Sequence, residues 1–395
     1  MKKITIISLV LLLCLSLTGC KSFFPKGKEM EKYDAVTVMG IDRSEAEPSR
    51  VEVTLLSKVE KSGDGGGSVT IKTSSESAPT VFEAQRNLRT KEEKVTYLGY
   101  VDYLLIGEGA AADDFTKYFD FFVRDHETRL SPRVYVVKGG TAKELIETTS
   151  STKIFLTDQL ANIINGAEIL GNSSDTKIID TINQLDGKTG AAVIPAIKSK
   201  ELENQKRSGE MAEKDVAPAG FAVIKDFRLA GYFDGSAVLG YDFLTDKVKS
   251  CPISVRDISG ACTALEVVNT KTDVEAKFEG DALKKVLYRV TVTSALAEQQ
   301  SRERLTTEEG LTDLERKQAE YIQSVMTDAI KESKNFGTDC FALAEKIKLQ
   351  HPVKWEKIKD SWDKLYPGLE IDTEVVSTVA RSYEINQPNG YKGED

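Results

Sequence analysis

Histidine is the first residue type to examine for chemistry, because imidazole is a common general base and metal ligand. The chain has 395 residues but only two histidines, His126 and His351, which lie far apart in the sequence. Neither lies in the spacing that zinc sites or H-E-x-x-H proteases require. The sequence therefore predicts no metal site and disfavours histidine-based catalysis.

Short segments match fragments of nucleotide-binding and acyl-transfer motifs. Gly187-Lys188-Thr189 resembles the end of a P-loop, but Ile182 occupies the position of the required earlier glycine, which argues against ATP binding. Ser150-Ser151-Thr152-Lys153 and Lys188-Thr189-Gly190 match the S-x-x-K and K-T-G motifs of penicillin-binding enzymes. They lie close together with no S-x-N motif between them. A cell-wall enzyme is therefore only a third hypothesis.

The N-terminus carries the most specific signal in the chain. Met1-Lys2-Lys3 is positively charged and is followed by an apolar stretch from Ile4 to Leu17. This stretch is shorter than the roughly 20 residues that span a membrane and fits the hydrophobic region of a secretory signal. Leu17-Thr18-Gly19-Cys20 resembles the bacterial lipobox. We expect residues 1–19 to be a signal peptide and Cys20 to be the lipidation site; a plain signal peptide and an uncleaved anchor are the alternatives.

The remaining composition is that of an acidic globular protein. Hydrophobic residues make up 40% and charged residues 29%, and the net charge is −9. With no run of five basic residues, we expect no nucleic-acid binding. Without Cys14 and Cys20 an odd number of thiols remains, a poor framework for disulfides; a Cys251–Cys262 bridge stays open.

Strands and helices alternate without a regular βα repeat, which predicts an α+β, multi-domain protein with mixed or antiparallel sheets each packed with helices. A highly charged stretch with few large apolar residues marks the main boundary. The expected segments are a tether (20–32), an N-terminal α+β domain (33–198), a charged linker or loop (199–217), a C-terminal α+β domain (218–384) and a disordered tail (385–395).

Several segments of the first half resemble one family, the Ger(x)C lipoproteins, which are the C subunits of bacterial spore germinant receptors. Tyr33 to Asp42 resembles the family's opening strand, which ends in Gly-Ile-Asp. Ser77 to Asn87 is similar to its T-hydrophobic-F-E-A helix. Tyr97 to Tyr100 and Leu104 to Ile106 resemble its tyrosine–glycine strand pair, and Phe119 to Asp125 its aromatic helix.

The second half carries the more specific resemblance. Ala222 to Tyr232 is similar to the start of the family's C-terminal domain. Gly337 to Phe341, His351 to Trp355 and Trp362 to Pro367 resemble its closing region in order. One departure lies after the lipidated cysteine, where the family often has Trp-Asp and this chain has Lys21-Ser22.

The resemblance implies a non-enzymatic protein without a cofactor, anchored by its lipidated cysteine to the outer face of the spore inner membrane. It also implies assembly with two integral membrane partners, the A and B subunits of a nutrient germinant receptor, and a role in spore germination. The resemblance also suggests three subdomains of mixed sheet and helix, with the first half subdivided near residue 140. Only Cys20 carries over as a functional residue. The nutrient, the stoichiometry and any direct small-molecule ligand are not implied. The alternative is an extracytoplasmic solute-binding lipoprotein of a transporter, a class that has two doubly wound α/β lobes.

Overall fold

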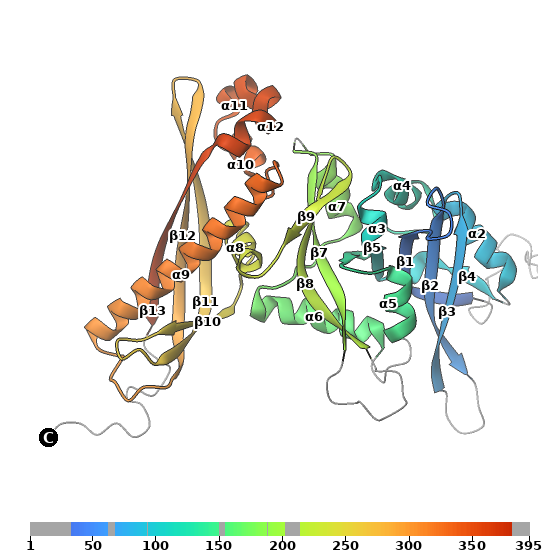
Figure 1. The fold of residues 1–395 in the computed structure, drawn as a ribbon, viewed down its shortest axis with the longest axis horizontal. Coiled ribbons are helices and arrows are strands. Elements are labelled where there is room, and N and C mark those ends of the chain that lie inside the picture. Colours follow the sequence, from blue (N-terminus) through green and yellow to red (C-terminus); the bar gives the residue numbers. More distant parts are fainter. Residues whose placement is uncertain are drawn as a thin grey trace, which may run out of the picture.

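The computed structural model describes residues 33–61, 68–92, 94–149, 155–187, 189–201 and 214–380. They form an elongated molecule with two sheets, one in each half of the chain (Figure 1). We call residues 33–233 the N-terminal module and residues 236–380 the C-terminal module. The fold class is α+β, as the sequence predicts. Cys20, the expected signal peptide and tether, and the tail from 385 on lie outside the described residues.

The N-terminal sheet has the strand order β3-β2-β1-β5-β6-β7-β8-β9, with β4 paired to β1. Strands β1, β5, β6 and β7 are parallel in the centre, and antiparallel pairs flank them on both sides. The strands are β1 (Tyr33–Arg43), β2 (Val51–Lys61), β3 (Ser68–Ala78), β4 (Val95–Tyr97), β5 (Tyr103–Gly107), β6 (Arg133–Val137), β7 (Ala191–Glu201), β8 (Lys214–Lys225) and β9 (Arg228–Phe233).

Helices cover both faces of this sheet, which is why its central strands are buried on both sides. Helices α2, α3, α4 and α7 pack on one face, and α5 and α6 pack on the other. In β1, Val36, Met39 and Ile41 point to the first face and Val38 to the second. The helices are α2 (Val81–Lys91), η2 (Leu98–Tyr100), α3 (Glu108–Ala111), α4 (Thr116–Arg124), α5 (Ala142–Thr149), α6 (Leu156–Leu170) and α7 (Ile178–Leu185).

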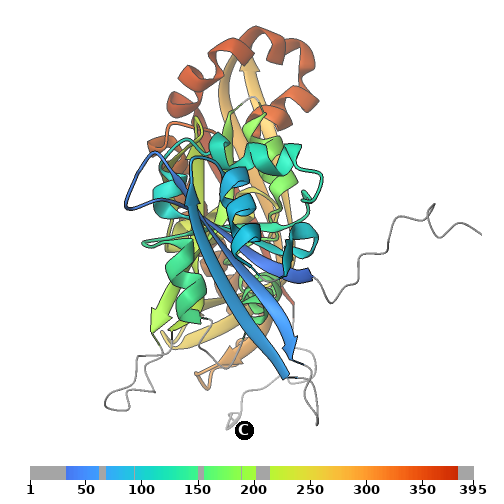
Figure 2. The same ribbon diagram turned by 90° about the vertical axis from the view of Figure 1, so that its right-hand side faces the viewer.

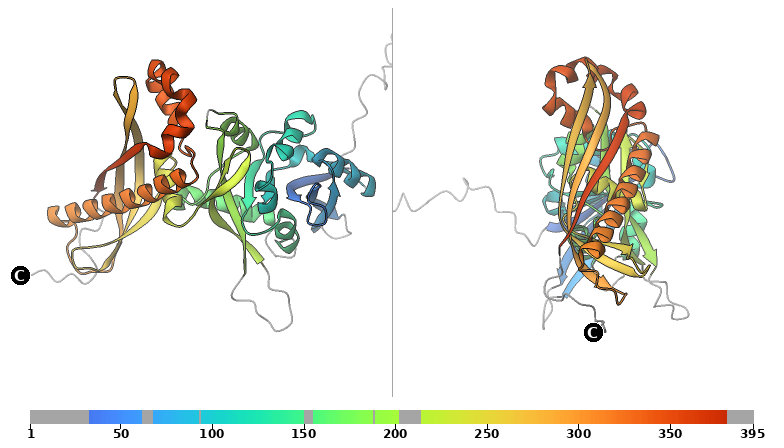
Figure 3. Two further views of the ribbon diagram at one scale, coloured as in Figure 1. Left: turned by 45° about the horizontal axis from the view of Figure 1, so that its top comes forward. Right: turned by 90° about the vertical axis from the view of Figure 1, so that its left-hand side faces the viewer.

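The C-terminal sheet has the order β10-β11-β12-β13. Strands β10, β11 and β12 pair antiparallel, and the last strand, β13, returns parallel to β12. The long helix α9 runs beside β13 (Figure 3). The elements are α8 (Ser236–Leu244), β10 (Cys251–Arg256), β11 (Cys262–Glu279), β12 (Ala282–Gln299), α9 (Glu308–Asn335), α10 (Leu343–Gln350), α11 (Pro352–Ile358), η3 (Lys359–Ser361), α12 (Trp362–Leu365), η4 (Tyr366–Gly368) and β13 (Glu370–Ala380).

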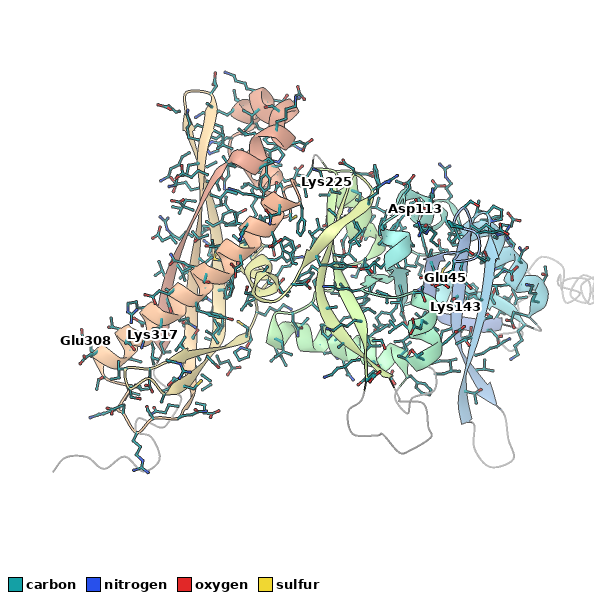
Figure 4. All side chains as sticks on the ribbon, viewed as in Figure 1. Glu45, Asp113, Lys143, Lys225, Glu308 and Lys317 are labelled. Carbon is teal, nitrogen blue, oxygen red and sulfur yellow. The ribbon has the colours of Figure 1, made fainter. Side chains whose placement is uncertain are left out.

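A shared apolar core joins the two modules. Phe233 at the end of β9 stacks on Tyr241 of α8 with ring centroids 5.3 Å apart, and it meets Phe336 edge-on at 5.5 Å. Lys225 of β8, labelled in Figure 4, donates from Nζ to the carbonyl oxygen of Gly337 over 2.9 Å. Hydrophobic interfaces of this kind oppose free movement between domains. This contact therefore restricts the movement of the two modules relative to each other.

The charged stretch 199–217, expected to be a linker or a loop, begins and ends inside the N-terminal sheet. Strands β7 and β8 pair antiparallel as far as Glu201 and Lys214, so its two ends belong to a hairpin. The charged residues at its start belong to the exposed end of β7, from Lys198 to Glu201. The N-terminal sheet thus continues to Phe233 instead of ending at 198.

The sheet also runs without interruption past residue 140. Val136 of β6 is paired with Ala196 of β7, and α5 packs back onto β1. A subdivision near residue 140 is therefore absent from the described part of the chain. Figure 2 shows the molecule from the end of the N-terminal module, with the blue strands β2 and β3 toward the viewer. No helix among the described residues is long and apolar enough to cross a bilayer.

Candidate functional site

The lipidation site predicted at Cys20 lies outside the described residues, as do Ser150, Lys153 and Lys188. The rest of the P-loop-like fragment forms a turn, in which the backbone N–H of Gly190 donates to the carbonyl of Gly187 over 3.1 Å. Gly190 has φ 55°, a left-handed conformation that favours glycine. Turn chemistry therefore accounts for both glycines.

The three remaining thiols are free. Burial raises the pKa of Cys251 and of Cys340 to about 12, so both stay protonated and poorly nucleophilic at neutral pH. Cys251 pairs with Val267 and Cys262 with Arg256, at opposite ends of the β10–β11 ladder. Five residues of strand separate them, roughly 17 Å, whereas a disulfide needs Cα atoms within about 7 Å. The open Cys251–Cys262 bridge is therefore not formed.

The two histidines lie near the ends of helices, away from each other in the sequence. His351 precedes α11 and its ring lies edge-on to Phe278, with centroids 5.2 Å apart. His126 lies in the turn after α4. Among the described residues, no group of three or more His, Cys, Asp or Glu side chains is placed to hold a metal ion.

A cavity of about 420 Å³ lies where the two modules meet. We call it the inter-sheet cavity. One wall comes from α7 and the start of β7, and the other from the end of α8 and the start of α10. Its apolar surface includes Val193, Tyr241 and Phe341, and its polar surface includes Asn183 and Thr245. This size and mixture are typical of sites for small molecules.

Two lysines from the C-terminal module line this cavity. Lys247 follows α8, where Asp246 adopts φ 59° and turns the chain; its Nζ donates to the hydroxyl of Tyr241 over 3.3 Å. Lys346 lies on α10, and its Nζ donates to the carbonyl of Leu244 over 3.3 Å and lies 5.5 Å from the centre of the Tyr288 ring. Burial lowers the pKa of Lys346, and Asp339 and Asp246 partly offset this.

The buried carboxylate beside these lysines is fully engaged with backbone. Asp339 accepts hydrogen bonds from the N–H groups of Phe341, Leu343 and Ala344 at 2.7–3.1 Å and thereby caps α10. Burial raises its pKa, and the three N–H groups oppose that rise. Glu345 lies nearby on the cavity wall and forms an ion pair with Lys348 at 3.4 Å. The arrangement can bind and orient a ligand, but it presents no activated nucleophile.

A second hollow of about 340 Å³ lies at the opposite end, where the described chain begins. Three tyrosines line it, with successive rings edge-on at 5.9 and 5.5 Å. An ion pair between Arg89 and Glu127 forms its floor. The tyrosines are Tyr33, Tyr97 and Tyr100.

Comparison with known proteins identifies the family. The model for the spore germination protein N-terminal domain matches residues 26–199, and the model for the spore germination B3/GerAC-like C-terminal domain matches residues 219–383. The chain belongs to the Ger(x)C family of spore germination proteins. The two matched regions meet across the β7–β8 hairpin, so the sequence families divide the chain within one sheet.

Relatives of the Ger(x)C chain cover almost all of it. Spore germination protein KC of Bacillus subtilis (strain 168) is 21% identical over 100% of this chain and 99% of its own length. A crystal structure of the GerBC protein has a TM-score of 0.55 at 17% identity, covering 86% of this chain and 96% of that one. At this identity the structural match establishes the fold.

Sequence reasoning missed the inter-sheet cavity. Lys247 and Lys346 are ordinary surface-type residues in the sequence and lie in no motif. Both lysines line one cavity because the end of α8 meets the start of α10 in the fold, and no local sequence pattern predicts this meeting.

Proposed function

We propose that this chain is the lipid-anchored, non-catalytic C subunit of a nutrient germinant receptor that acts in spore germination. The observation that carries the proposal is the end-to-end family match combined with a cysteine at position 20 behind a signal-like leader. Its site would be the outer face of the spore inner membrane, and its partners the integral membrane A and B subunits.

The anchor follows from the arithmetic of acyl chains. Each buried CH₂ contributes about 0.8 kcal/mol, so one chain binds a bilayer marginally and two chains bind it stably. A diacylglyceryl group on Cys20 would supply two. Thirteen residue steps separate Cys20 from Tyr33, so an extended tether would reach roughly 45 Å. The folded modules would then stay in a thin layer above the membrane, where weak contacts with neighbouring subunits suffice.

Two observations support a non-catalytic role. The buried thiols Cys251 and Cys340 have raised pKa values, and the glycines of the P-loop-like fragment belong to a turn. The alternative, a solute-binding lipoprotein, would have two similar doubly wound lobes. Here the C-terminal sheet is a long antiparallel ribbon with one parallel strand, which favours the receptor subunit.

Fractionation of cells that express the full chain tests the anchor. Cys20→Ala should move the protein from the membrane pellet to the soluble fraction, because the thiol that accepts the lipid is gone. Cys262→Ala is the matched control and should stay in the pellet, since this free cysteine lies in the folded part. Retention of Cys20→Ala in the membrane after a high-salt wash would rule out acylation as the anchor.

A further inference from the structure

We propose that the inter-sheet cavity binds a small carboxylate with an apolar body, and that the bound anion ties the two modules together. The cavity lies between α7 of the N-terminal module and α10 of the C-terminal module. This proposal goes beyond the receptor-subunit assignment and does not depend on the lipid anchor.

The first argument is unsatisfied positive charge. Lys247 and Lys346 each donate one long hydrogen bond, at 3.3 Å, to a neutral oxygen. A lysine ammonium has three N–H donors, so each keeps donors for a ligand. Within the described ranges neither ammonium has a carboxylate partner in an ion pair, which leaves their charge uncompensated at contact distance.

The second argument is that the nearby anions do not cancel this charge at close range. Both oxygens of Asp339 point to backbone N–H groups at the start of α10. Glu345 is drawn toward Lys348, one turn along the same helix. Asp242 and Asp180 act on Lys247, and Asp246 acts on Lys346, but no ion pair at contact distance joins them to the two ammonium groups. A carboxylate that enters the cavity could therefore contact both ammonium groups directly.

The third argument concerns the rest of the ligand. Val193, Tyr241 and Phe341 give the cavity apolar surface, and Asn183 adds an amide on the opposite wall. An inorganic anion would leave that apolar surface in contact with water. A carboxylate attached to a ring or a branched chain would cover it, so the shape favours an organic acid over phosphate.

The consequence is a link between the modules. The cations come from the C-terminal module, whereas Asn183 and Val193 come from the N-terminal module. A ligand that binds both walls stabilises the closed junction by mass action, because it binds the assembled form. Binding of the acid would therefore strengthen the contact between the two modules.

Titration of the purified full chain with sodium benzoate, against sodium chloride at constant ionic strength, tests the proposal. Benzoate should bind saturably at one site per chain, raise the melting temperature and slow amide exchange in both α7 and α10. Phosphate should bind at least tenfold more weakly, since it lacks the apolar body. Benzoate without saturable binding, or protection confined to one module, would overturn the proposal.

Variants locate the site. Lys346→Met keeps the length of the side chain and should weaken benzoate binding at least tenfold, the usual worth of a charge-assisted hydrogen bond. Lys247→Glu replaces the second cation of the cavity lining with an anion at an exposed residue. It should weaken benzoate binding as much, which keeps the test valid if Lys346→Met folds poorly. The control Lys331→Met, at an exposed position of α9 outside the cavity lining, should bind as the wild type does. Equal binding by all three variants would refute the site.

Discussion

At the scale of single residues, the Gly-Ile-Asp segment at the end of β1 connects this strand to neighbouring elements. The carboxylate of Asp42 accepts hydrogen bonds from the backbone N–H groups of Ala142 and Lys143 at 2.8 and 2.9 Å, and so caps α5. Gly107 on the neighbouring strand makes room for it, because a Cβ there would lie 1.9 Å from Asp42 Oδ1. Lys143, labelled in Figure 4, in turn forms an ion pair with Glu52 on β2. The segment therefore holds β1, β5 and α5 together.

A second buried carboxylate has no such compensation. Asp242 on α8 is 1% exposed, and its Oδ1 has no hydrogen-bond partner among the described residues. Burial raises its pKa to about 7, and Lys247 lowers it only in part. Because the folded protein holds this proton more tightly than the unfolded chain does, the stabilising contribution is complete below about pH 4 and is lost as the pH rises through 7.

Asp242→Asn should therefore remove a pH-dependent loss of stability. The variant should be more stable than the wild type at pH 8 by about 2–4 kcal/mol, which corresponds to most of the rise in the pKa of Asp242. This difference in stability should shrink toward pH 4. Urea unfolding at pH 4 to 8 measures it, with Asp273→Asn on exposed β11 as the control. A difference between variant and wild type that does not change with pH would contradict this account of Asp242.

Residue-level prediction succeeded where a pattern is local. Helical spacing predicts a core face for Phe115, Tyr118, Phe119 and Phe122 and a buried pair in Trp355 and Trp362, and all six side chains are buried. It failed for Tyr321, which the same kind of spacing places on the core face of α9 but which is 40% exposed. The buried carboxylates could not be predicted, because the partners of Asp42 lie about 100 positions away in the sequence.

At the scale of elements, α8 and α9 approach each other closely in the C-terminal module. Gly240 allows this approach, since a Cβ at that position would lie 1.9 Å from the carbonyl oxygen of Val325 and 3.0 Å from Cβ of Ala329. A backbone atom cannot yield as a flexible side chain does. The close approach also places Tyr241 against the shared core and Lys247 at the inter-sheet cavity.

Gly240→Ala should consequently destabilise the protein by about 2 kcal/mol or more, within or above the range for overpacked cores. Gly166→Ala is the matched control: it lies within α6 with no atom within 4 Å of an added Cβ, so the better helix former should stabilise by about 0.5–1 kcal/mol. Chemical denaturation of both variants measures the pair. Equal effects of the two substitutions would show that the α8–α9 approach is not constrained by Gly240.

Element types could be predicted from periodicity, but their boundaries and partners could not. The spacing of Trp355, Trp362 and Leu365 predicts one helix that starts at Pro352. The structure breaks it into α11, η3 and α12, with both tryptophans buried. The closing strand is present as β13, yet nothing in its alternation indicates that it lies parallel to β12. The β7–β8 hairpin could not be predicted either, because its exposed end has the composition of a linker.

At the scale of the whole molecule, one apolar cluster joins the two modules, and the described part of the chain begins at Tyr33, 13 positions after Cys20 in the sequence. The tyrosine-lined hollow lies at this end, and the inter-sheet cavity lies farther along the molecule, between the modules. A rigid two-module body of this form suits the proposed role of a subunit that contacts its neighbours through its surface. Its role then depends on what it assembles with.

Co-purification from spore membranes tests the central claim most directly. The full chain, tagged at its C-terminus, is extracted in mild detergent, and the proteins that accompany it are identified by mass spectrometry with Cys20→Ala as the control. We predict that the wild type carries two integral membrane proteins in constant proportion and that Cys20→Ala recovers much less of both. Recovery of the wild-type chain from the membrane without any integral membrane partner would contradict the assignment as a receptor subunit.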